Sequence, residues 1–378
     1  MKKLLITGGA GFIGSNLIQR LYQTGYTITV LDNLSPQIHG KNPIEDSLLY
    51  KSIIGKVNFL EGSVTNVNDW RKVLKNQDII VHLAAETGTG QSMYEIKKYT
   101  DVNIGGTALL LDLLTNTSHS IKKMVVASSR AIYGEGKYLC AEHGDVFPLS
   151  RSEMDMLNGD FACKCPMCGQ VVKLQSTNEE SKMHPTSVYG ITKQNQEQMV
   201  LTVCKSLGIS AVGLRYQNVY GVGQSLSNPY TGILSIFSTR IKNGNDLNIF
   251  EDGKESRDFV YIDDVVRATI SAIEEEKIEN DVFNIGTGVT TDVLTVAKTL
   301  IEKYKSNSKI VVSGNFRLGD IRHNFADISK ANKMLNYMPE ISFQEGIELF
   351  CNWVNSQDIL DDNYDQSIEE MKQKGLYK

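Results

Sequence analysis

Short apolar runs alternate with amphipathic stretches along the first third of the chain. The runs KLLITG, TITVLD, VNFLEG, DIIVHLAA and KMVVASS are typical of buried strands. The stretches 13–22 and 102–114 repeat their apolar residues at helical spacing. Strands that alternate with helices in this way build βαβ units around a parallel sheet. We therefore predict an α/β fold with a doubly wound parallel sheet.

A glycine-rich turn follows the first of these strands, with glycines at Gly8, Gly11 and Gly14. Glycine allows the turn to close and the backbone to approach a pyrophosphate, which the N–H groups of the following helix then face. Asp32 ends the second strand, where a carboxylate can bind the ribose hydroxyls of adenosine. Because no Arg follows Asp32, the pattern predicts a Rossmann-type site for NAD rather than NADP.

The composition is that of an ordinary soluble protein, with 41% hydrophobic and 22% charged residues. A net charge of -5 provides no broad basic surface, so neither nucleic acid nor an anionic membrane is an expected partner. No uninterrupted apolar run is long enough to predict a membrane-spanning helix. The cytoplasm is therefore the expected compartment, and small molecules are the expected ligands.

The spacing Tyr-x-x-x-Lys occurs three times, starting at Tyr94, Tyr133 and Tyr189. YGEGK at Tyr133 has two glycines and is typical of a turn, and no hydroxyl partner is apparent near Tyr94. Tyr189 begins an amphipathic run, which puts Lys193 one helical turn away on the same face. An ammonium beside a phenol favours the phenolate, so this pair is the candidate acid–base group. Ser129 ends the fifth strand, at the sheet edge where ligands bind, and could orient the phenol.

Together these motifs resemble the extended short-chain dehydrogenase/reductase family that acts on nucleotide sugars. The resemblance covers nearly the whole chain and includes the TGGAGFIG start, Ser129, and Tyr189 with Lys193. Further matches are HLAAETG (82–88), VNIGGT (102–107), LRYQNVYG (214–221), RDFVYIDDV (257–265) and LGDIRHNFADISKA (318–331). The resemblance implies a Rossmann domain over 1–214 and a smaller α/β substrate-binding domain, mainly 215–378, with some exchange of chain between the two.

The resemblance also implies the residues of two binding sites. The cofactor residues it implies are Gly8, Gly11, Phe12, Ile13, Gly14, Asp32, Asn33, Ser63, Val64, Ala84, Ala85, Asn103, Tyr189 and Lys193. The substrate residues it implies are Thr87, Arg130, Gln217, Asn218, Asn228, Arg257, Arg317 and Arg322, with the base pocket near 249–251. Guanidinium groups suit a pyrophosphate by charge and by fork geometry, so the arginines of the C-terminal part are candidate diphosphate ligands.

The resemblance implies a 4-epimerase, in which Tyr189 takes a proton from the sugar's 4-hydroxyl and the 4-hydride passes to NAD. Hydride then returns to the opposite face of a 4-keto intermediate, so NAD is regenerated. Dehydratases of the family carry Asp-Glu after the hydroxyl residue, where this chain has Arg130 and Ala131. A nucleotide-sugar reductase or dehydrogenase uses the same triad and is the alternative. A non-catalytic NAD-binding scaffold is disfavoured because Ser129, Tyr189 and Lys193 are all present.

Three of the six cysteines lie within DFACKCPMCGQVV, residues 160–172. This stretch belongs to an insertion of about 135–177, where galactose 4-epimerases of the family have a shorter connection. CPMCG has the form of a zinc knuckle. The expected ligands of a structural zinc ion are Cys140, Cys163, Cys165 and Cys168, with His143 as the substitute for Cys140. We predict that this zinc holds a flap beside the sugar site; reduced thiols or a redox pair are the alternative.

The insertion and the segment LRYQNVYGVGQSLSNPYTGILSIFSTRI are most similar to those of dTDP-L-rhamnose 4-epimerases. Such enzymes interconvert dTDP-L-rhamnose and dTDP-6-deoxy-L-talose, which implies a role in cell-surface polysaccharide biosynthesis. The family is often dimeric through a helix bundle, so a homodimer is expected, with the helices 102–114 and 189–207 as candidates for the interface. Packing within one chain would give the same apolar stripe. The polar segment from Gln357 onward predicts a solvated helix without an assigned function.

Overall fold

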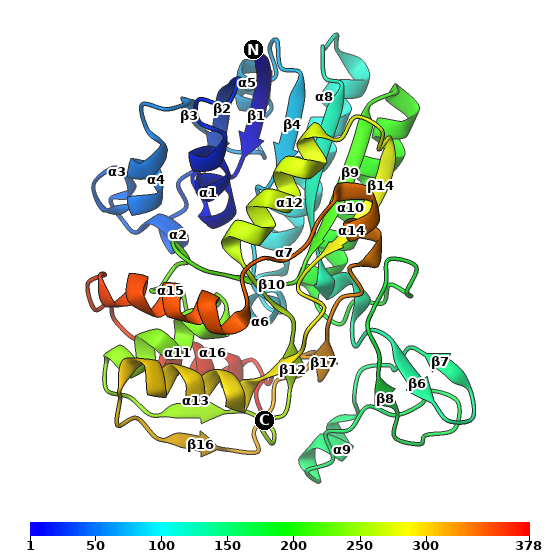
Figure 1. Ribbon diagram of the computed structural model, residues 1–378, viewed down its shortest axis with the longest axis vertical. Helices are drawn as coiled ribbons and strands as arrows, with labels where there is room; N and C mark the ends of the chain where they lie inside the picture. Colours follow the sequence, from blue (N-terminus) through cyan, green and yellow to red (C-terminus); the bar gives the residue numbers. More distant parts are fainter.

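A seven-stranded parallel sheet forms the larger part of the molecule, in the strand order β14-β9-β5-β4-β1-β2-β3 (Figure 1). The structure is a computed structural model and describes residues 1–378. The strands of this sheet are β1 (Lys2–Thr7), β2 (Tyr26–Asp32), β3 (Asn58–Glu61), β4 (Ile79–His82), β5 (Lys123–Ser129), β9 (Ser210–Tyr216) and β14 (Asn280–Ile285). All neighbouring strands are parallel, which confirms the predicted doubly wound sheet.

Helices cover both faces of this sheet. Successive residues of β1 point to opposite faces, so Leu4 and Ile6 join one hydrophobic core and Leu5 joins the other. The first core includes residues of α1 (Phe12–Leu21) and α12 (Ile262–Glu274), and the second includes residues of α5 (Val67–Val73), α8 (Gly106–Asn116) and α10 (Val188–Leu207). Burial on both faces explains why the strands read as nearly continuous apolar runs.

The strand order reverses at β1, which lies between β2 and β4. Chain segments that leave the carboxyl ends of β1 and β4 therefore diverge, and in folds of this type ligands bind in the crevice between them. The segment after β2 contains the short helices α2 (Pro36–His39), α3 (Pro43–Asp46) and α4 (Leu48–Ile53). The segment after β4 contains α6 (Thr89–Ser92), α7 (Ile96–Tyr99) and a π-helix (Thr100–Gly105) that leads into α8.

Most of the chain after β9 forms the smaller part, which lies below the large sheet in Figure 1. Its strands form three small groups: β10 (Asn218–Tyr220) with β13 (Phe259–Tyr261), β11 (Leu247–Ile249) with β16 (Ile310–Val312), and β12 (Ser256–Arg257) between β15 (Thr291–Asp292) and β17 (His323–Asn324). Besides α12, the helices after β9 are α11 (Ile233–Lys242), α13 (Val293–Tyr304), α14 (Ser329–Leu335), α15 (Phe343–Asn355) and α16 (Tyr364–Gln373). The chain returns to the large sheet at β14, so its second half contributes to both parts.

The insertion after β5 forms a small lobe of its own. A 3-10 turn (Arg130–Tyr133) leads to β6 (Tyr138–Cys140), which pairs antiparallel with β7 (Gly144–Val146) and β8 (Lys173–Leu174), and α9 (Glu153–Leu157) lies between β7 and β8 in the chain. These elements project at the lower right of Figure 1. Cys140, Cys163 and Cys165 are buried in the small core of this lobe, together with Tyr138.

The C-terminal segment differs from the solvated helix that its polar composition predicted. α16 buries Tyr364, Ile368 and Met371, whose spacing puts them on one helical face. After α16, the last three residues pair antiparallel with 316–318. Burial of this one face explains why so polar a helix packs onto the protein.

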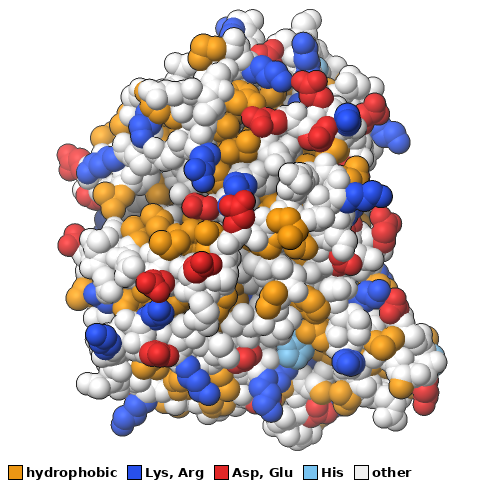
Figure 2. Space-filling model, viewed as in Figure 1, with side chains coloured by type: hydrophobic (Ala, Val, Ile, Leu, Met, Phe, Trp, Pro, Cys, Tyr) orange, Lys and Arg blue, Asp and Glu red, His pale blue; other side chains and the backbone are white.

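Charged side chains of both signs are interspersed over the face shown in Figure 2. This mixed surface agrees with the composition of the chain, which has 44 acidic and 39 basic residues. None of the helices has both the length and the apolar character that crossing a bilayer requires.

Candidate functional site

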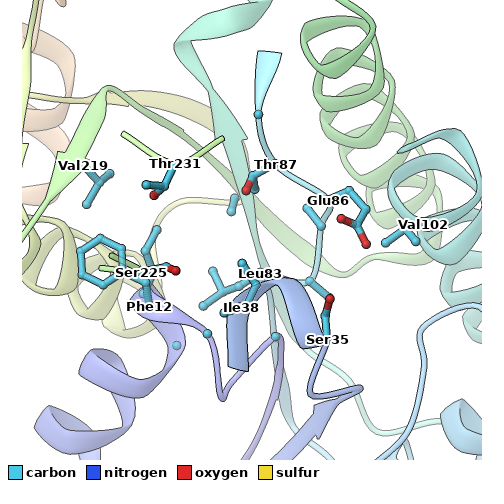
Figure 3. Close-up of a pocket in the computed structure, with 18 of the residues that line it drawn as sticks. Phe12, Ser35, Ile38, Leu83, Glu86, Thr87, Val102, Val219, Ser225 and Thr231 are labelled. Atoms are coloured by element: carbon cyan, nitrogen blue, oxygen red, sulfur yellow. The ribbon is translucent and has the colours of Figure 1, made fainter. Parts of the chain in front are cut away.

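A cavity of about 450 Å³ opens at the carboxyl ends of the central strands. Its walls come from the glycine turn, from the segments after β2 and β4, and from Val219 of β10 (Asn218–Tyr220) with Ser225 and Thr231 of the loop that follows (Figure 3). The predicted cofactor residues that line it are Gly8, Gly11, Phe12, Ile13, Gly14, Asp32, Asn33, Ser63, Val64, Ala84, Ala85, Tyr189 and Lys193. The predicted substrate residues that line it are Thr87, Arg130, Gln217, Asn218 and Asn228. The structure therefore brings all but one of the predicted cofactor residues and five of the eight predicted substrate residues together in one cavity.

The glycine turn packs too closely for side chains. Gly8 has a φ of +68°, and a Cβ there would lie 2.8 Å from the backbone nitrogen of Ala84. A Cβ at Gly14 would overlap the Gly8 carbonyl oxygen. Gly11 is the N-cap of α1 and supplies no side-chain cap, so the N–H groups of the first helical turn are available to an anion. The turn thus fits the pyrophosphate of a dinucleotide.

The Asp32 carboxylate is buried at the end of β2 and accepts the backbone N–H groups of Ala10 and Leu34, each at 2.9 Å. Its Oδ1 lies 3.9 Å from Nε2 of His39. Burial lowers the pKa of His39, which leaves its ring neutral at physiological pH. The carboxylate therefore has no fixed cation beside it, an arrangement that suits ribose hydroxyls and opposes an added 2′-phosphate.

Ser129, Tyr189 and Lys193 line the same cavity as the glycine turn. Ser129 ends β5, and its Oγ accepts the N–H of Ala131 at 3.1 Å. The Tyr189 N–H donates to Ser92 Oγ at 3.0 Å, which holds the first turn of α10 against α6. The helix then places Lys193 one turn after Tyr189, and both side chains reach the cavity.

The other two Tyr-x-x-x-Lys pairs lie outside the cavity. Tyr133 is buried, where it donates to Asn284 Oδ1 at 2.8 Å and accepts from Arg215 at 2.7 Å. Tyr94 donates to Tyr230 Oη at 2.7 Å. Of the three tyrosines, only Tyr189 meets Ser129 in the structure.

Burial raises the pKa of Tyr189, while its hydrogen bond with Ser129 and the positive charge of Arg130 lower it. Lys193 was expected to lower this pKa, but its Nζ donates instead to Gln196 Oε1 at 2.6 Å. Burial also lowers the pKa of Lys193 to about 7. Arg130 is therefore the cation that acts on the phenol in this structure, a role that sequence reasoning missed.

Asn103 is the predicted cofactor residue that does not reach the cavity. Its side chain is fully buried, accepts the Glu86 N–H at 2.8 Å and donates to Thr192 Oγ1 at 3.0 Å. Asn103 thus links the segment after β4 to α10. Asn103 was expected to contact the cofactor directly. Instead, its side chain contacts the segment after β4 and α10, two elements that form the wall of the cavity.

Gln217 and Asn218 follow β9 and line the cavity. Arg130 Nε donates to Asn218 Oδ1 at 2.8 Å. Gln217 is only 5% exposed, and neither its amide nitrogen nor its amide oxygen has a hydrogen-bond partner. A buried amide without partners costs free energy, so an open amide on a cavity wall indicates a polar ligand.

The three C-terminal arginines lie outside this cavity, in a buried ionic network. Asp320 accepts from Arg317 at 2.7 Å and from Arg257 at 3.4 Å. Although burial alone would raise it, the charges of these two arginines hold the pKa of Asp320 well below its ordinary range. Arg322 donates to Glu251 at 2.8 Å. The predicted diphosphate ligands thus form one group, and sequence reasoning missed the carboxylates that hold them.

Several further residues of the cavity were not predicted. They include Ser35, Gln37, Ile38, His39, Glu86, Gln224, Ser225, Tyr230 and Thr231. Glu86 lies within the HLAAETG match and pairs with Lys98 at 3.1 Å, so it carried a sequence signal. Most of the others reach the cavity through the shapes of two loops, for which the sequence offers no motif.

Four side chains of the insertion converge on one point. The ligand atoms of Cys140, His143, Cys165 and Cys168 all lie within 4.8 Å of one another. Cys140 Sγ lies 3.6 Å from His143 Nδ1 and 3.7 Å from Cys168 Sγ, and Cys165 Sγ lies 3.7 Å from His143 Nδ1. Tetrahedral zinc with bonds of about 2.3 Å to sulfur and about 2.0 Å to nitrogen separates its ligand atoms by about 3.6–3.8 Å. The group therefore fits a tetrahedral metal site.

Cys163 is not a member of this group, and the predicted ligand set is corrected at this position. Its Sγ donates to Tyr138 Oη at 3.2 Å inside the small core. The Val172 N–H donates to the Cys163 carbonyl at 3.1 Å, which fixes this part of the chain in a ladder. His143, predicted as the substitute for Cys140, takes the place of Cys163 instead, because the exposed turn between β6 and β7 presents its ring to the thiols.

The comparisons with known proteins point to one family. The model of the NAD dependent epimerase/dehydratase family matches residues 4–150 and 163–286. The dTDP-L-rhamnose 4-epimerase of Burkholderia thailandensis is 36% identical over 357 residues, covering 93% of this chain and 95% of that protein. Among solved structures, the UDP-glucose 4-epimerase of Thermotoga maritima with UDP-glucose has a TM-score of 0.75 and 30% identity, covering 93% of this chain and 98% of that one.

A second solved structure adds the cofactor. The UDP-glucuronic acid 4-epimerase of Bacillus cereus, in complex with UDP-glucuronic acid and NAD, has a TM-score of 0.73 and 26% identity and covers 93% of this chain and 99% of that one. The family match extends over the glycine turn, Ser129, Tyr189 and Lys193. The resemblance seen in the motifs is thereby confirmed, and the chain belongs to the NAD dependent epimerase/dehydratase family of extended short-chain dehydrogenases/reductases.

Proposed function

We propose that this chain is an NAD-dependent nucleotide-sugar 4-epimerase. The observation that carries the proposal is the shared cavity, which the glycine turn and Asp32 line together with Ser129, Tyr189 and Lys193. An acid–base triad beside a dinucleotide site suits oxidation of a hydroxyl and reduction of the resulting ketone. The relatives described above support this reaction, since all three are 4-epimerases of different nucleotide sugars.

In this reaction Tyr189 accepts the proton of the sugar's 4-hydroxyl, and Ser129 orients the phenol and the sugar oxygen. NAD, which the glycine turn and Asp32 would hold, would supply the hydride acceptor for oxidation at C4 and the hydride donor for reduction of the 4-keto sugar. Tyr189 gives its proton back in the second half of the reaction, so protons and electrons balance without an external reductant. Arg130 favours the phenolate by charge, and Lys193, whose pKa is about 7, can change its own charge at neutral pH.

Two other reactions of the family fit less well. Elimination of water needs an additional acid, and the carboxylates that line the cavity are Asp32, at the adenosine end, and Glu86, which pairs with Lys98. A reductase that consumes NADPH is opposed by the Asp32 carboxylate. A dehydrogenase that uses NAD shares the triad and is distinguished by its product.

We further propose that the substrate pair is dTDP-L-rhamnose and dTDP-6-deoxy-L-talose. The 36% identical relative is a dTDP-L-rhamnose 4-epimerase, and the insertion resembles that of such enzymes. The test is to incubate the purified protein with dTDP-L-rhamnose and to follow the sugar by proton NMR, first without added cofactor. We expect dTDP-6-deoxy-L-talose to appear. No change even after NAD is added would exclude this substrate and require UDP- and GDP-sugars, whereas a 4-keto sugar with NADH would indicate a dehydrogenase.

We also propose that Cys140, His143, Cys165 and Cys168 hold a structural zinc ion. The separations of their ligand atoms agree with a tetrahedral Cys₃His site, and four protein ligands leave no open position for chemistry. The β6–β7 hairpin supplies the first two ligands and the CPMCG turn supplies the other two. Zinc would therefore join two turns of a lobe whose own hydrophobic core has only six buried residues.

Metal content tests this proposal independently of activity. Mass spectrometry of the purified protein should find about one zinc per chain. His143→Ala and Cys168→Ser should each lower the zinc content, whereas Cys163→Ser and the core variant Cys204→Ser should keep it. Loss of zinc in Cys163→Ser but not in His143→Ala would restore the ligand set that the sequence predicted, and a zinc-free protein after reconstitution would exclude the metal.

We propose in addition that the protein is a homodimer through α8 and α10. α7, the π-helix and α8 all pack against α10. Ile96 on α7 and Ile191 on α10 are about half exposed, at 53% and 45%. Two exposed isoleucines on neighbouring helices are a surface that a second copy of the chain could cover.

A further inference from the structure

The last residues of the chain complete the strand that carries Arg317. Phe316 and Lys378 exchange two backbone hydrogen bonds of 3.0 Å, and the Leu318 N–H donates to the Leu376 carbonyl at 3.0 Å. Arg317 and Tyr377 therefore stand opposite each other in a short antiparallel ladder. Without the C-terminal residues, the backbone on both sides of Arg317 would lose these partners.

The side chain of Tyr377 packs behind Arg317. The Arg317 guanidinium lies over the ring of Phe250 at 5.2 Å, and the ring of Tyr377 meets the same ring edge to face at 5.3 Å. Tyr377 Oη accepts from Asn248 at 3.2 Å and from Asn315 at 3.0 Å. Tyr377 thereby holds the aromatic ring on which the guanidinium rests.

α16 connects this region with the large cavity. Tyr230, which lines the cavity, donates to the Glu370 carboxylate of α16, and Tyr94 donates to the same oxygen at 3.2 Å. Met371 and Leu376 line a small hollow together with Arg317, Asp320 and residues of α6. In Figure 1, α16 lies among the elements of the smaller part and below the large sheet. The C-terminal segment 364–378 thus contacts both a residue of the cavity wall, Tyr230, and Arg317 of the arginine group.

Arg317 retains an unused donor in this setting. Its Nη2 binds Asp320 at 2.7 Å, but its Nε is buried and has no hydrogen-bond partner. An unpaired buried donor on a guanidinium suits an anionic oxygen, and phosphate oxygens accept such bonds strongly.

We propose that the segment 364–378 is a wall of the nucleotide-sugar site and that Tyr377 is a positioning residue, which holds Arg317 for the diphosphate of a nucleoside diphosphate. This inference rests on the proposed function, because it assigns a role to the diphosphate of the same substrate. It also gives the C-terminal segment a function that its polar sequence did not indicate.

Calorimetry on the NAD-loaded protein, with dTDP and UDP as probes, tests the inference. Tyr377→Ala and a chain that ends at Gly375 should weaken diphosphate binding by about tenfold, the effect of losing one well-placed bond to a charged group. KM for the nucleotide sugar should rise by a similar factor, while kcat stays within about twofold, since the triad is untouched. Tyr377→Phe keeps the ring and should weaken diphosphate binding less than Tyr377→Ala does. Lys333→Ala, at an exposed position of α14 outside this segment, is the control and should bind as the wild type does.

The outcomes separate this inference from the proposed function. Unchanged diphosphate binding in both the Tyr377→Ala variant and the shortened chain would overturn it. Tighter binding in the shortened chain would also overturn it, because the segment would then be a plug. If Tyr377→Ala does not fold, as judged by loss of the thermal shift that NAD produces, the comparison of Tyr377→Phe with Lys333→Ala decides. A wild-type protein that binds both diphosphates but converts no nucleotide sugar would instead contradict the 4-epimerase proposal.

Discussion

At the scale of single residues, Arg130 links the acid–base group to the substrate end of the cavity. Its Nε is held by Asn218 at 2.8 Å, and its charge lowers the pKa of Tyr189. Burial and the neighbouring Arg257 lower the pKa of Arg130 itself to about 9, which still leaves it charged at neutral pH. One guanidinium therefore acts on the phenol and is placed where it can contact the sugar or the diphosphate.

Replacing Arg130 by Met should move the pH dependence of kcat. Without the positive charge the pKa of Tyr189 rises, so the phenolate forms at higher pH and the acidic limb of the profile shifts upward by about one unit. The measurement is kcat between about pH 6 and pH 10 for both proteins. Arg130→Lys keeps a charge and should shift less. A profile that does not move, with only KM altered, would restrict Arg130 to substrate binding.

Replacing Gln217 by Leu should stabilise the protein and impair substrate binding at the same time. The substitution removes a buried amide without partners, which should raise the free energy of unfolding by about 1 kcal/mol or more. It also removes a donor and an acceptor from the cavity wall, so KM for the nucleotide sugar should rise several-fold, about 3–10-fold for one or two neutral hydrogen bonds. Urea unfolding and steady-state kinetics test the two effects. A loss of stability would show that the amide serves the fold.

At the scale of elements, a buried arginine is one of the contacts that join the insertion to the smaller part of the molecule. Arg151 donates to Glu135 at 3.2 Å and to Glu251 at 2.6 Å, and it reaches the Asp320 carbonyl at 3.1 Å. The side chains of Arg151, Glu135 and Glu251 are each at most 3% exposed. A lobe that projects from the molecule thus contributes a charge to the network that holds the arginines near the proposed diphosphate site.

Removing the charge of Arg151 should lower the free energy of unfolding far more than removing an exposed charge in the same lobe. Arg151→Met leaves Glu135 buried without its cation, and breaking a buried ion pair in this way costs about 3–5 kcal/mol. Lys164→Met is the matched control: its pairs with Asp155 and Asp160 are partly exposed, and such pairs contribute less than about 1 kcal/mol. Urea unfolding at constant zinc content compares them. If both variants lost the same free energy of unfolding, the buried network would contribute no more to stability than the exposed pairs do.

The sequence predicted those elements whose signals are local. The strand–glycine–helix pattern and the helix that begins at Tyr189 follow from spacing within one segment, and the structure has both. The proposed zinc ligands depend on how β6, β7 and the CPMCG turn face one another, so choosing between Cys163 and His143 needed the fold. The polar composition of α16 concealed a stripe at Tyr364, Ile368 and Met371, a signal that spacing alone could have revealed.

At the scale of the whole molecule, distant pieces of chain converge on residues 250–251 of the smaller part. The insertion reaches Glu251 through Arg151, and the C-terminal segment reaches Phe250 through Tyr377. The proposed triad, by contrast, lies on β5 and α10, which belong to the large sheet and the helices that cover it. The proposed catalytic groups are therefore placed by the large sheet, whereas these distant pieces of chain shape the smaller part. A second copy of the chain bound at α10 would therefore affect the proposed catalytic groups on that helix.

A homodimer through α10 should separate into monomers when its exposed face becomes charged. Ile191 lies on the same helix as Tyr189 and Lys193, and an interface there would restrain the helix that carries both. Ile191→Glu places a carboxylate at the contact and, by symmetry, opposite its copy, so the interface has to bury charge or open. Analytical ultracentrifugation should give twice the chain mass for the wild type and a single chain mass for Ile191→Glu. Val311→Glu, at a similarly exposed position on β16, should remain dimeric. A wild type that sediments as a monomer, or an Ile191→Glu variant that stays dimeric, would place any association on another surface.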